Sequence, residues 1–117
     1  MMDRVETTIL RNLLHEEEYI RKVIPFIEPD YFDNHQERVI FEEIAQFIVK
    51  YDKPATQEIL QIEIENRSDI NDTEFKEISE LISSLHIQVV NFEWLIDITE
   101  KWCKDRAIYL ALMSSIK

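Results

Sequence analysis

The stretch EPDYFDNHQERVIFEEIAQF, residues 28–47, decides how this chain folds. An aromatic pair, Tyr31 and Phe32, stands directly before Asp33 and Asn34, two polar residues that are typical of helix starts. Apolar residues then recur at spacings of three and four, a pattern that predicts an amphipathic helix. This helix is expected to end at about Tyr51. The residues expected on its core-facing side are Ile40, Phe41, Ile44, Phe47, Ile48 and Tyr51.

The same stretch could serve as a binding site or as a corner of the fold. Burying Tyr31 and Phe32 together, between this helix and the one before it, accounts for both rings at the lowest cost in free energy. His35 and Arg38 lie off the core-facing side near Glu42, where a surface ion pair is expected to contribute little. The stretch is therefore interpreted as a structural corner.

Further helices are predicted on both sides of this corner. Residues 5–14 and 19–24 each show the helical spacing of apolar residues, and Pro25 is expected to end the second helix. After a break at residues 53–54, a helix capped by a threonine is expected over residues 56–66.

Two later helix starts have clear capping signals. Asn71 as N-cap places Glu74 at the third helical position, a variant of the capping box. Ile70 and Phe75 have the spacing of a hydrophobic staple. At the next start, Asn91 is the expected N-cap, and Val90 and Leu95 have the spacing of a hydrophobic staple. A long sixth helix is expected from about Phe92. Because the sequence contains no strand pattern, the predicted fold class is all-α: a compact bundle of about five helices plus the long sixth.

The sixth helix has an apolar arc that is too wide for a single contact, since it covers more than half of the circumference. Either the helix is deeply buried, or it faces its own domain on one side and a partner on the other. The pattern also stops without a glycine, Asn or proline stop signal, so we expect more protein beyond Lys117. The candidate partner or assembly residues are Trp94, Ile98, Trp102, Ile108 and Leu112, of which the two tryptophans could equally belong to the core.

Arg106 places a charge in the middle of this apolar arc. An unpaired charge there would lose its hydration, so we expect its side chain to reach an acid or the carbonyls at a helix end of the globular part. As a structural tie of this kind, Arg106→Ala is expected to destabilise the domain by about 2 to 4 kcal/mol.

The composition excludes several classes of site. The 117 residues, 45% of them hydrophobic, suit one globular domain, and the absence of glycine excludes the phosphate-binding loops of nucleotide enzymes. The single cysteine, Cys103, excludes an internal disulfide and a cysteine-based metal cage, suits a cytoplasmic protein, and is expected to act as a buried small apolar residue. His15 beside three glutamates lacks a second histidine at ligand spacing, and no apolar run approaches membrane-spanning length. We expect no catalytic, cofactor or metal site.

The net charge of −11 argues against direct binding to a nucleic-acid backbone. Residues 91–117 hold four acids and four bases, so residues 1–90 carry the whole excess of negative charge. The chain is therefore divided into an acidic globular part, residues 1–90, and a neutral apolar part, residues 91–117.

The order of these features resembles the N-terminal domain of DnaB-type hexameric replicative helicases, most of all those of tailed phages. The resemblance rests on VIPFIEPDYF at 23–32, HQERVIF at 35–41, KPAT at 53–56, and WL at 94–95 leading into KDRA at 104–107. It spans nearly the whole chain, and its specificity lies in the joint order rather than in any one piece. The sequence departs from the family in having no glycine in the turn before Pro54.

The resemblance implies a non-catalytic collar domain. Residues 91–117 would be the first arm of a helical hairpin, and the second arm, a linker and the motor domain with its ATP and Mg²⁺ would follow. The partners implied are the other subunits of the hexamer and a primase, in the cytoplasm of the cell or of the phage's host. Two other classes compete with this interpretation: a free-standing acidic phage protein that mimics DNA to block a host factor, and a small hydrolase, for which the sequence offers no nucleophile and base.

Overall fold

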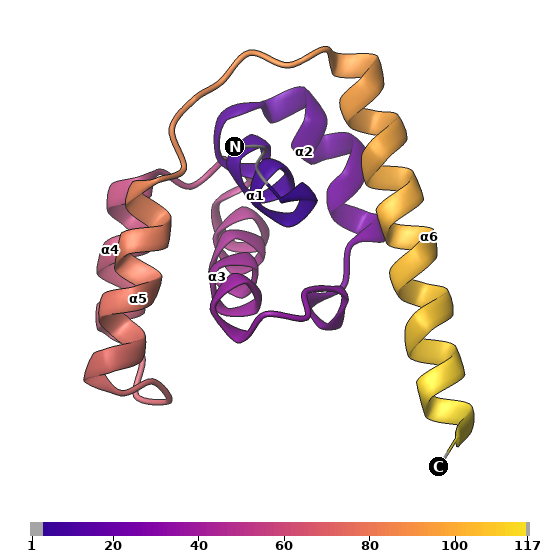
Figure 1. Cartoon of the computed structure of the whole chain (residues 1–117). Helices are drawn as coiled ribbons and strands as arrows, with labels where there is room; N and C mark the ends of the chain where they lie inside the picture. The colour runs from indigo at the N-terminus through magenta and orange to yellow at the C-terminus, as the bar shows by residue number, and fades with distance from the viewer. Residues whose placement is uncertain (1–3, 117) are drawn as a thin grey trace.

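The computed structural model describes residues 4–116, which contain helices and no strand and so confirm the all-α fold. Along this range six α-helices follow one another, with two short 3-10 helices between the second and the third (Figure 1). Their bounds are α1 Val5–His15, α2 Glu17–Val23, η1 Ile24–Phe26, η2 Pro29–Tyr31, α3 His35–Tyr51, α4 Gln57–Glu65, α5 Asp72–Ser83 and α6 Phe92–Ile116.

The helix α3 lies at the centre of the bundle. It packs against α1 and against the hairpin formed by α4 and α5. The long helix α6 packs against α1, α2 and η2, on the side of the molecule away from that hairpin (Figure 1). The segment 84–91 crosses between the two sides and connects α5 to α6.

The predicted helix starts are confirmed in detail. Asn34 caps α3 by accepting hydrogen bonds from two backbone amides, and Thr56 caps α4 in the same way with one. Asn71 and Glu74 form a complete capping box at the start of α5. The Asn91 side chain accepts a hydrogen bond from the Trp94 amide at 2.9 Å, which fixes the first turn of α6.

The turn after α3 is formed without glycine. Asp52 adopts the left-handed conformation, with φ 54° and ψ 35°, and its amide donates to the Ile48 carbonyl at 2.8 Å. Among residues other than glycine, Asp and Asn reach this region at the lowest steric cost. Asp52 therefore ends α3 before Pro54, in the left-handed conformation that a glycine would otherwise adopt.

The core joins the bundle to the first half of α6. Phe32 is fully buried, with ring centroids 5.1 Å from Phe41 and 4.9 Å from Trp102. The Tyr19 hydroxyl and the Thr99 hydroxyl are hydrogen-bonded at 2.6 Å, and both residues are buried. Burial raises the pKa of the Tyr19 phenol, so this pair remains neutral at any physiological pH.

The predicted core side of α3 extends too far at its C-terminal end. Ile40, Phe41 and Ile44 are buried as predicted, but the side chain of Tyr51 is 53% exposed. Its ring packs on Phe47, with centroids 4.6 Å apart, instead of entering the core. Helical periodicity gives the direction of a side chain but not the distance to which neighbouring elements cover it.

The prediction for the aromatic corner is half right. Phe32 enters the core, but Tyr31 is half-buried and meets Trp102 of α6 edge to face, with centroids 5.9 Å apart. Tyr31 therefore contacts the long helix and is not enclosed between α2 and α3, because the η2 turn directs the two adjacent side chains to different neighbours.

The expected surface ion pair forms at His35, but with Glu74 instead of Glu42, and Arg38 takes no part in it. The Arg38 side chain turns back and donates to the Phe32 carbonyl at 3.0 Å, because that carbonyl lies free where the chain turns into α3. The His35 imidazole lies 3.1 Å from a Glu74 carboxylate oxygen, and Glu42 contacts Arg67 at 3.3 Å. Arg38 therefore supports the interpretation of this stretch as a corner, by a contact that the sequence did not indicate.

Candidate protein-binding surface

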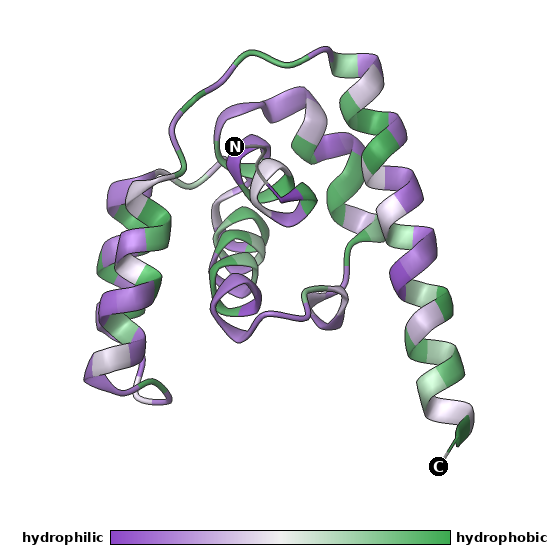
Figure 2. Ribbon diagram, viewed as in Figure 1, coloured by the Kyte–Doolittle hydropathy of each residue, from purple (hydrophilic) through white to green (hydrophobic). Residues whose placement is uncertain are grey.

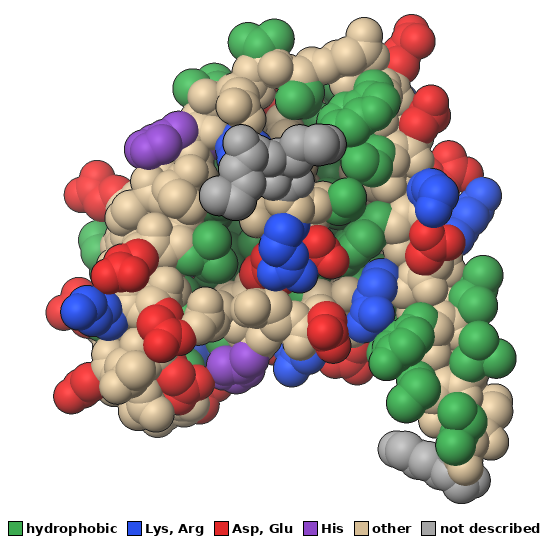
Figure 3. Space-filling view, in the orientation of Figure 1, with side chains coloured by type: hydrophobic (Ala, Val, Ile, Leu, Met, Phe, Trp, Pro, Cys, Tyr) green, Lys and Arg blue, Asp and Glu red, His purple; other side chains and the backbone are tan. Residues whose placement is uncertain are grey.

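The environment of α6 changes along its length. Leu95, Thr99 and Trp102 in its first half are buried in the core. Beyond Arg106 the helix leaves the globular part, and its side chains are exposed apart from the half-buried Leu110 (Figure 1). Figure 2 shows that apolar residues continue along this projecting half, and Figure 3 shows their hydrophobic side chains at the surface.

Four of the five predicted assembly residues lie on one flank of α6. At about 100° per residue, Trp94, Ile98, Ile108 and Leu112 fall within an arc of about 80°. Three are largely open to solvent, Trp94 at 50%, Ile108 at 59% and Leu112 at 61%, while Ile98 is half-buried against the core. The structure therefore leaves most of this flank exposed to solvent, and its role in assembly stays a prediction.

Trp102, the fifth predicted assembly residue, belongs to the core instead. Its side chain is 8% exposed, packs on Phe32, and donates from Nε1 to a Glu6 carboxylate oxygen at 3.3 Å. It lies about a quarter turn from Trp94 around the helix, which directs it to the bundle. Of the two tryptophans, Trp102 is therefore a core residue, whereas Trp94 is half exposed and its role at an interface stays a prediction.

Arg106 reaches a carbonyl at a helix end, as expected. Its Nε donates to the carbonyl oxygen of Tyr31, the last residue of η2, at 2.6 Å. The guanidinium also lies 4.8 Å from the centroid of the Tyr109 ring. The side chain is half-buried, so the charge keeps part of its hydration. Its contribution to stability stays a prediction.

A buried carboxylate near the start of α1 was not anticipated. Glu37 on α3 is 2% exposed and accepts from Arg4 at 3.2 Å, while its second carboxylate oxygen has no hydrogen-bond partner. Burial raises the pKa of the Glu37 carboxyl, Arg4 opposes the rise, and Glu6 and Asp33 add to it. The signal was in the sequence, because Glu37 precedes the core residues Ile40 and Phe41 by three and four positions.

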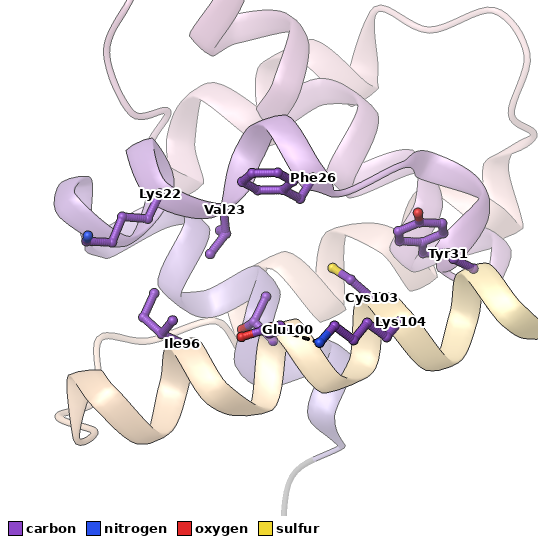
Figure 4. A pocket seen from close by; sticks show the side chains of 10 residues that line it. Lys22, Val23, Phe26, Tyr31, Ile96, Glu100, Cys103 and Lys104 are labelled. Atoms are coloured by element: carbon purple, nitrogen blue, oxygen red, sulfur yellow. Dashed lines mark ion pairs between the residues drawn. The ribbon is translucent and has the colours of Figure 1, made fainter.

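A groove of about 470 Å³ runs between α6 and the α2–η1–η2 segment (Figure 4). Phe26 stands 69% exposed at its edge, and Lys104 is held at the α6 side by an ion pair with Glu100 at 3.0 Å. Cys103 points into the groove and is half-buried, where the loss of hydration raises its pKa to about 11. A thiol with this pKa is almost entirely protonated at neutral pH and is therefore a poor nucleophile.

The hairpin of α4 and α5 carries most of the negative charge. Residues 57–83 contain eight acids and two bases, which is more than half of the net −11 of the chain. Arg67 joins the turn of this hairpin to α3, with Glu43 at 2.8 Å and Asp69 at 2.6 Å. These carboxylates raise the pKa of the guanidinium further, so the tie stays charged. A hairpin of this charge repels polyanions.

Two kinds of site are not found in residues 4–116. No group of three His, Cys, Asp or Glu side chains in this range could hold a metal ion. None of the helices in this range is both long enough and apolar enough to cross a membrane. The candidate functional surface is the open flank and the projecting half of α6, where Trp94, Ile108 and Leu112 are exposed.

Two comparisons show which known proteins the chain is similar to. The family model of the DnaB-like helicase N-terminal domain matches residues 3–100. A DnaB-like replicative helicase of Enterobacteria phage T4 is 28% identical to the chain over 109 residues. The matched region covers 93% of this chain but 23% of that helicase, so the chain spans about a quarter of the length of this relative.

Proposed function

The chain belongs to the family of DnaB-like helicase N-terminal domains, and from that premise we propose that it is the assembly and docking domain of a replicative DNA helicase. In this role it performs no catalytic step. It links neighbouring helicase subunits into a collar and offers a surface to which a primase binds, in the cytoplasm of the cell that replicates the DNA. ATP and Mg²⁺ act in a motor domain that lies outside these 117 residues.

The observation that carries this proposal is the open, apolar part of α6. Ile108, Leu112 and Ile116 are each at least 59% exposed on a helix whose first half is firmly packed in the core. A continuous apolar surface of this kind is unfavourable in water and typically marks a protein–protein contact. Because the core holds the helix in place, it can present that surface in a fixed direction.

The distribution of charge also supports a protein partner rather than DNA. The acidic hairpin of α4 and α5 repels phosphates, whereas residues 91–117 are neutral, with four acids and four bases. A neutral apolar helix is suited to contacts with other proteins.

The acidic hairpin is also the one observation that favours the alternative, an acidic protein that mimics DNA. A mimic would need its negative charge over the surface that its target contacts. Here the neutral helix α6 forms one whole side of the molecule and exposes apolar side chains. A DNA mimic would have no reason to expose them. We therefore place the alternative second.

Binding to a primase tests the proposal directly. The chain is immobilised, and the primase encoded by the same genome is passed over it at about 150 mM salt. Specific, saturable binding is expected, together with a loss of primer synthesis when excess chain is added to a reaction of that primase with its helicase. The absence of both effects would contradict the docking role.

A further inference from the structure

The groove between α6 and the α2–η1–η2 segment is a second apolar surface, separate from the open flank of α6. At about 100° per residue, Ile96 and Cys103 of the groove lie about 170° around the helix from Trp94 and Leu112 of the open flank. The first half of α6 therefore has the core on one side, the open flank on another and the groove on a third. A contact in the groove leaves the open flank free.

The two walls of the groove bring apolar side chains from distant parts of the chain together. Val23 and Phe26 come from α2 and η1, and Ile96 and Cys103 come from α6. Figure 4 shows these four side chains turned toward the same space. The ring of Phe26 is 69% exposed. Covering an aromatic ring that stands this far out of the fold removes a large apolar area from water, which makes it a natural anchor for a binding partner.

The shape of the groove favours a helix as its occupant. From Ile96 to Ala107 the groove follows α6 for about 16 Å, which is about three helical turns. The backbone groups of α2 and α6 are hydrogen-bonded within their own helices, so these walls offer no edge to which an extended peptide could add as a strand. A helix needs no such edge, because its own backbone is satisfied internally.

The charged residues that line the groove are two lysines and one glutamate. Lys104 is paired with Glu100 at 3.0 Å, whereas Lys22, on the α2 wall, makes no ion pair among residues 4–116. The groove therefore has an excess of one positive charge, although the chain as a whole carries −11. A carboxylate on the occupant would supply the partner that Lys22 lacks.

Local charge outweighs the distant acids at this place. The acidic α4–α5 hairpin lies on the other side of the molecule from α6 (Figure 1). At about 150 mM salt, charges separated by more than about 8 Å are largely screened, so Lys22 and Lys104 decide which partner fits. The exposed end of α6 in a second copy, residues 107–116, contains no acid and cannot provide the carboxylate.

We propose that this groove is a docking site for an amphipathic helix of another protein. The apolar side of that helix packs on Phe26 and Cys103, and a carboxylate at the edge of this side pairs with Lys22. This inference goes beyond the collar and primase roles proposed above and does not depend on them.

A pair of model peptides tests the chemistry of the groove. The first is a blocked helical peptide of about 14 residues, with leucine at every third or fourth position and glutamate at both edges of the apolar side. Its twin has lysine in place of each glutamate. The acidic peptide should bind at least about fivefold more tightly at about 150 mM salt. The net charge of the chain favours the opposite order, so equal or tighter binding of the lysine twin overturns the proposal.

The reaction of Cys103 with a maleimide shows whether the peptide occupies the groove. This residue is the only cysteine of the chain, and it points into the groove. Saturating acidic peptide should slow the reaction at least about fivefold at about pH 8. An unchanged rate would place the peptide elsewhere and overturn the proposal. A rate that falls as the chain itself is concentrated, without peptide, would assign the groove to a second copy and also overturn it.

Charge reversal on α2 tests the role of Lys22. Lys22→Glu should weaken binding of the acidic peptide at least about fivefold and strengthen binding of the lysine twin. Arg21→Glu is the matched control, because it makes the same change of charge one position earlier, where the side chain pairs with Glu17 at 2.9 Å outside the groove. Equal effects of the two substitutions on the acidic peptide would overturn the pairing with Lys22.

Truncation of the exposed ring tests the apolar contact. Phe26→Ala should weaken binding of the acidic peptide by about tenfold. Val49→Ala is its control, since Val49 is 86% exposed on α3 and does not line the groove. Because both side chains stand in solvent, both variants should fold as the parent does, which thermal unfolding checks. Binding that Phe26→Ala leaves unchanged would overturn the proposal.

This proposal and the docking role fail in different experiments. If the primase binds the chain but the acidic peptide does not protect Cys103, the docking role stands and the groove site falls. If the peptide binds as described and the primase does not, the groove site stands and the docking role falls.

Discussion

Arg106 links α6 to the corner at Tyr31 through a charge-assisted hydrogen bond of 2.6 Å. Because the side chain is half-buried, Arg106→Ala frees the carbonyl to bind water, and the expected loss of stability is about 1 to 2 kcal/mol. This is lower than the 2 to 4 kcal/mol expected from the sequence, which assumed a fully dehydrated charge. Urea unfolding of the two proteins measures the difference.

Lys104→Ala is the control for that experiment, since Lys104 is exposed two positions earlier on the same helix. Its free energy of unfolding should stay within about 0.5 kcal/mol of the parent value. Equal effects of the two substitutions would mean that the hydrogen bond to Tyr31 contributes nothing beyond the loss of a surface charge.

Glu37 makes the stability of the domain depend on pH. Burial raises the pKa of its carboxyl above the ordinary value of 4.5, so the folded protein binds this proton more tightly than the unfolded chain. Its favourable contribution is complete below about pH 4.5 and is lost as the pH rises through the folded-state pKa. We expect Glu37→Gln to be at least as stable as the parent at pH 7, with a difference that shrinks as the pH falls.

Urea midpoints measured from pH 4.5 to pH 7.5 check this behaviour. Glu18→Gln removes the same charge from an exposed position, so it corrects for the general effect of the net charge. A stability difference between Glu37→Gln and the parent that does not change with pH would contradict the assignment.

At the scale of helices and turns, capping residues were the most reliable guide. Asn34, Thr56, Asn71 and Asn91 each begin a helix where the sequence indicates, because a cap depends on residues within a few positions of one another. The burial of Tyr51 and the partners of Arg38 depend on elements remote in the sequence, and both were predicted wrongly.

Asp52 gives a prediction at this scale. A residue with a Cβ is strained in the left-handed conformation, and Asp52 is the one residue other than glycine with positive φ among those described. Asp52→Gly should raise the free energy of unfolding by about 0.5 to 1 kcal/mol, whereas Asp52→Ala should lower it. The ion pair lost to Arg21, at 3.8 Å between exposed side chains, is expected to matter little. Thermal or urea unfolding of the three proteins decides, and a less stable glycine variant would show that the turn is not strained.

At the scale of the whole molecule, the uneven charge predicts how the chain treats nucleic acid. With a net charge of −11, more than half of it on the α4–α5 hairpin, the isolated chain should bind single-stranded DNA more weakly than about 100 µM at 150 mM salt. Fluorescence anisotropy with a labelled oligonucleotide measures this affinity. Submicromolar binding would contradict both the charge argument and the proposed role.

The candidate surface was predicted from the sequence in outline only. The excess of apolar residues on the last helix identified α6, since an arc wider than one contact is visible in the periodicity itself. The sequence could not show that Trp102 is buried and Trp94 exposed, because their burial depends on which side of the helix packs against the bundle. It also did not indicate that Cys103 and Phe26, far apart in the chain, line one groove.

The attachment of α6 has a mechanical consequence. The helix is clamped between Leu95 and Arg106, and about ten further residues extend some 15 Å beyond this clamp. The projecting residues therefore amplify a rotation of α6 at the aromatic corner, and a tilt of about 10° there would displace the C-terminal end of the helix by about 3 Å. A ligand or substitution that repacks Tyr31 would move the far end of α6 without touching it.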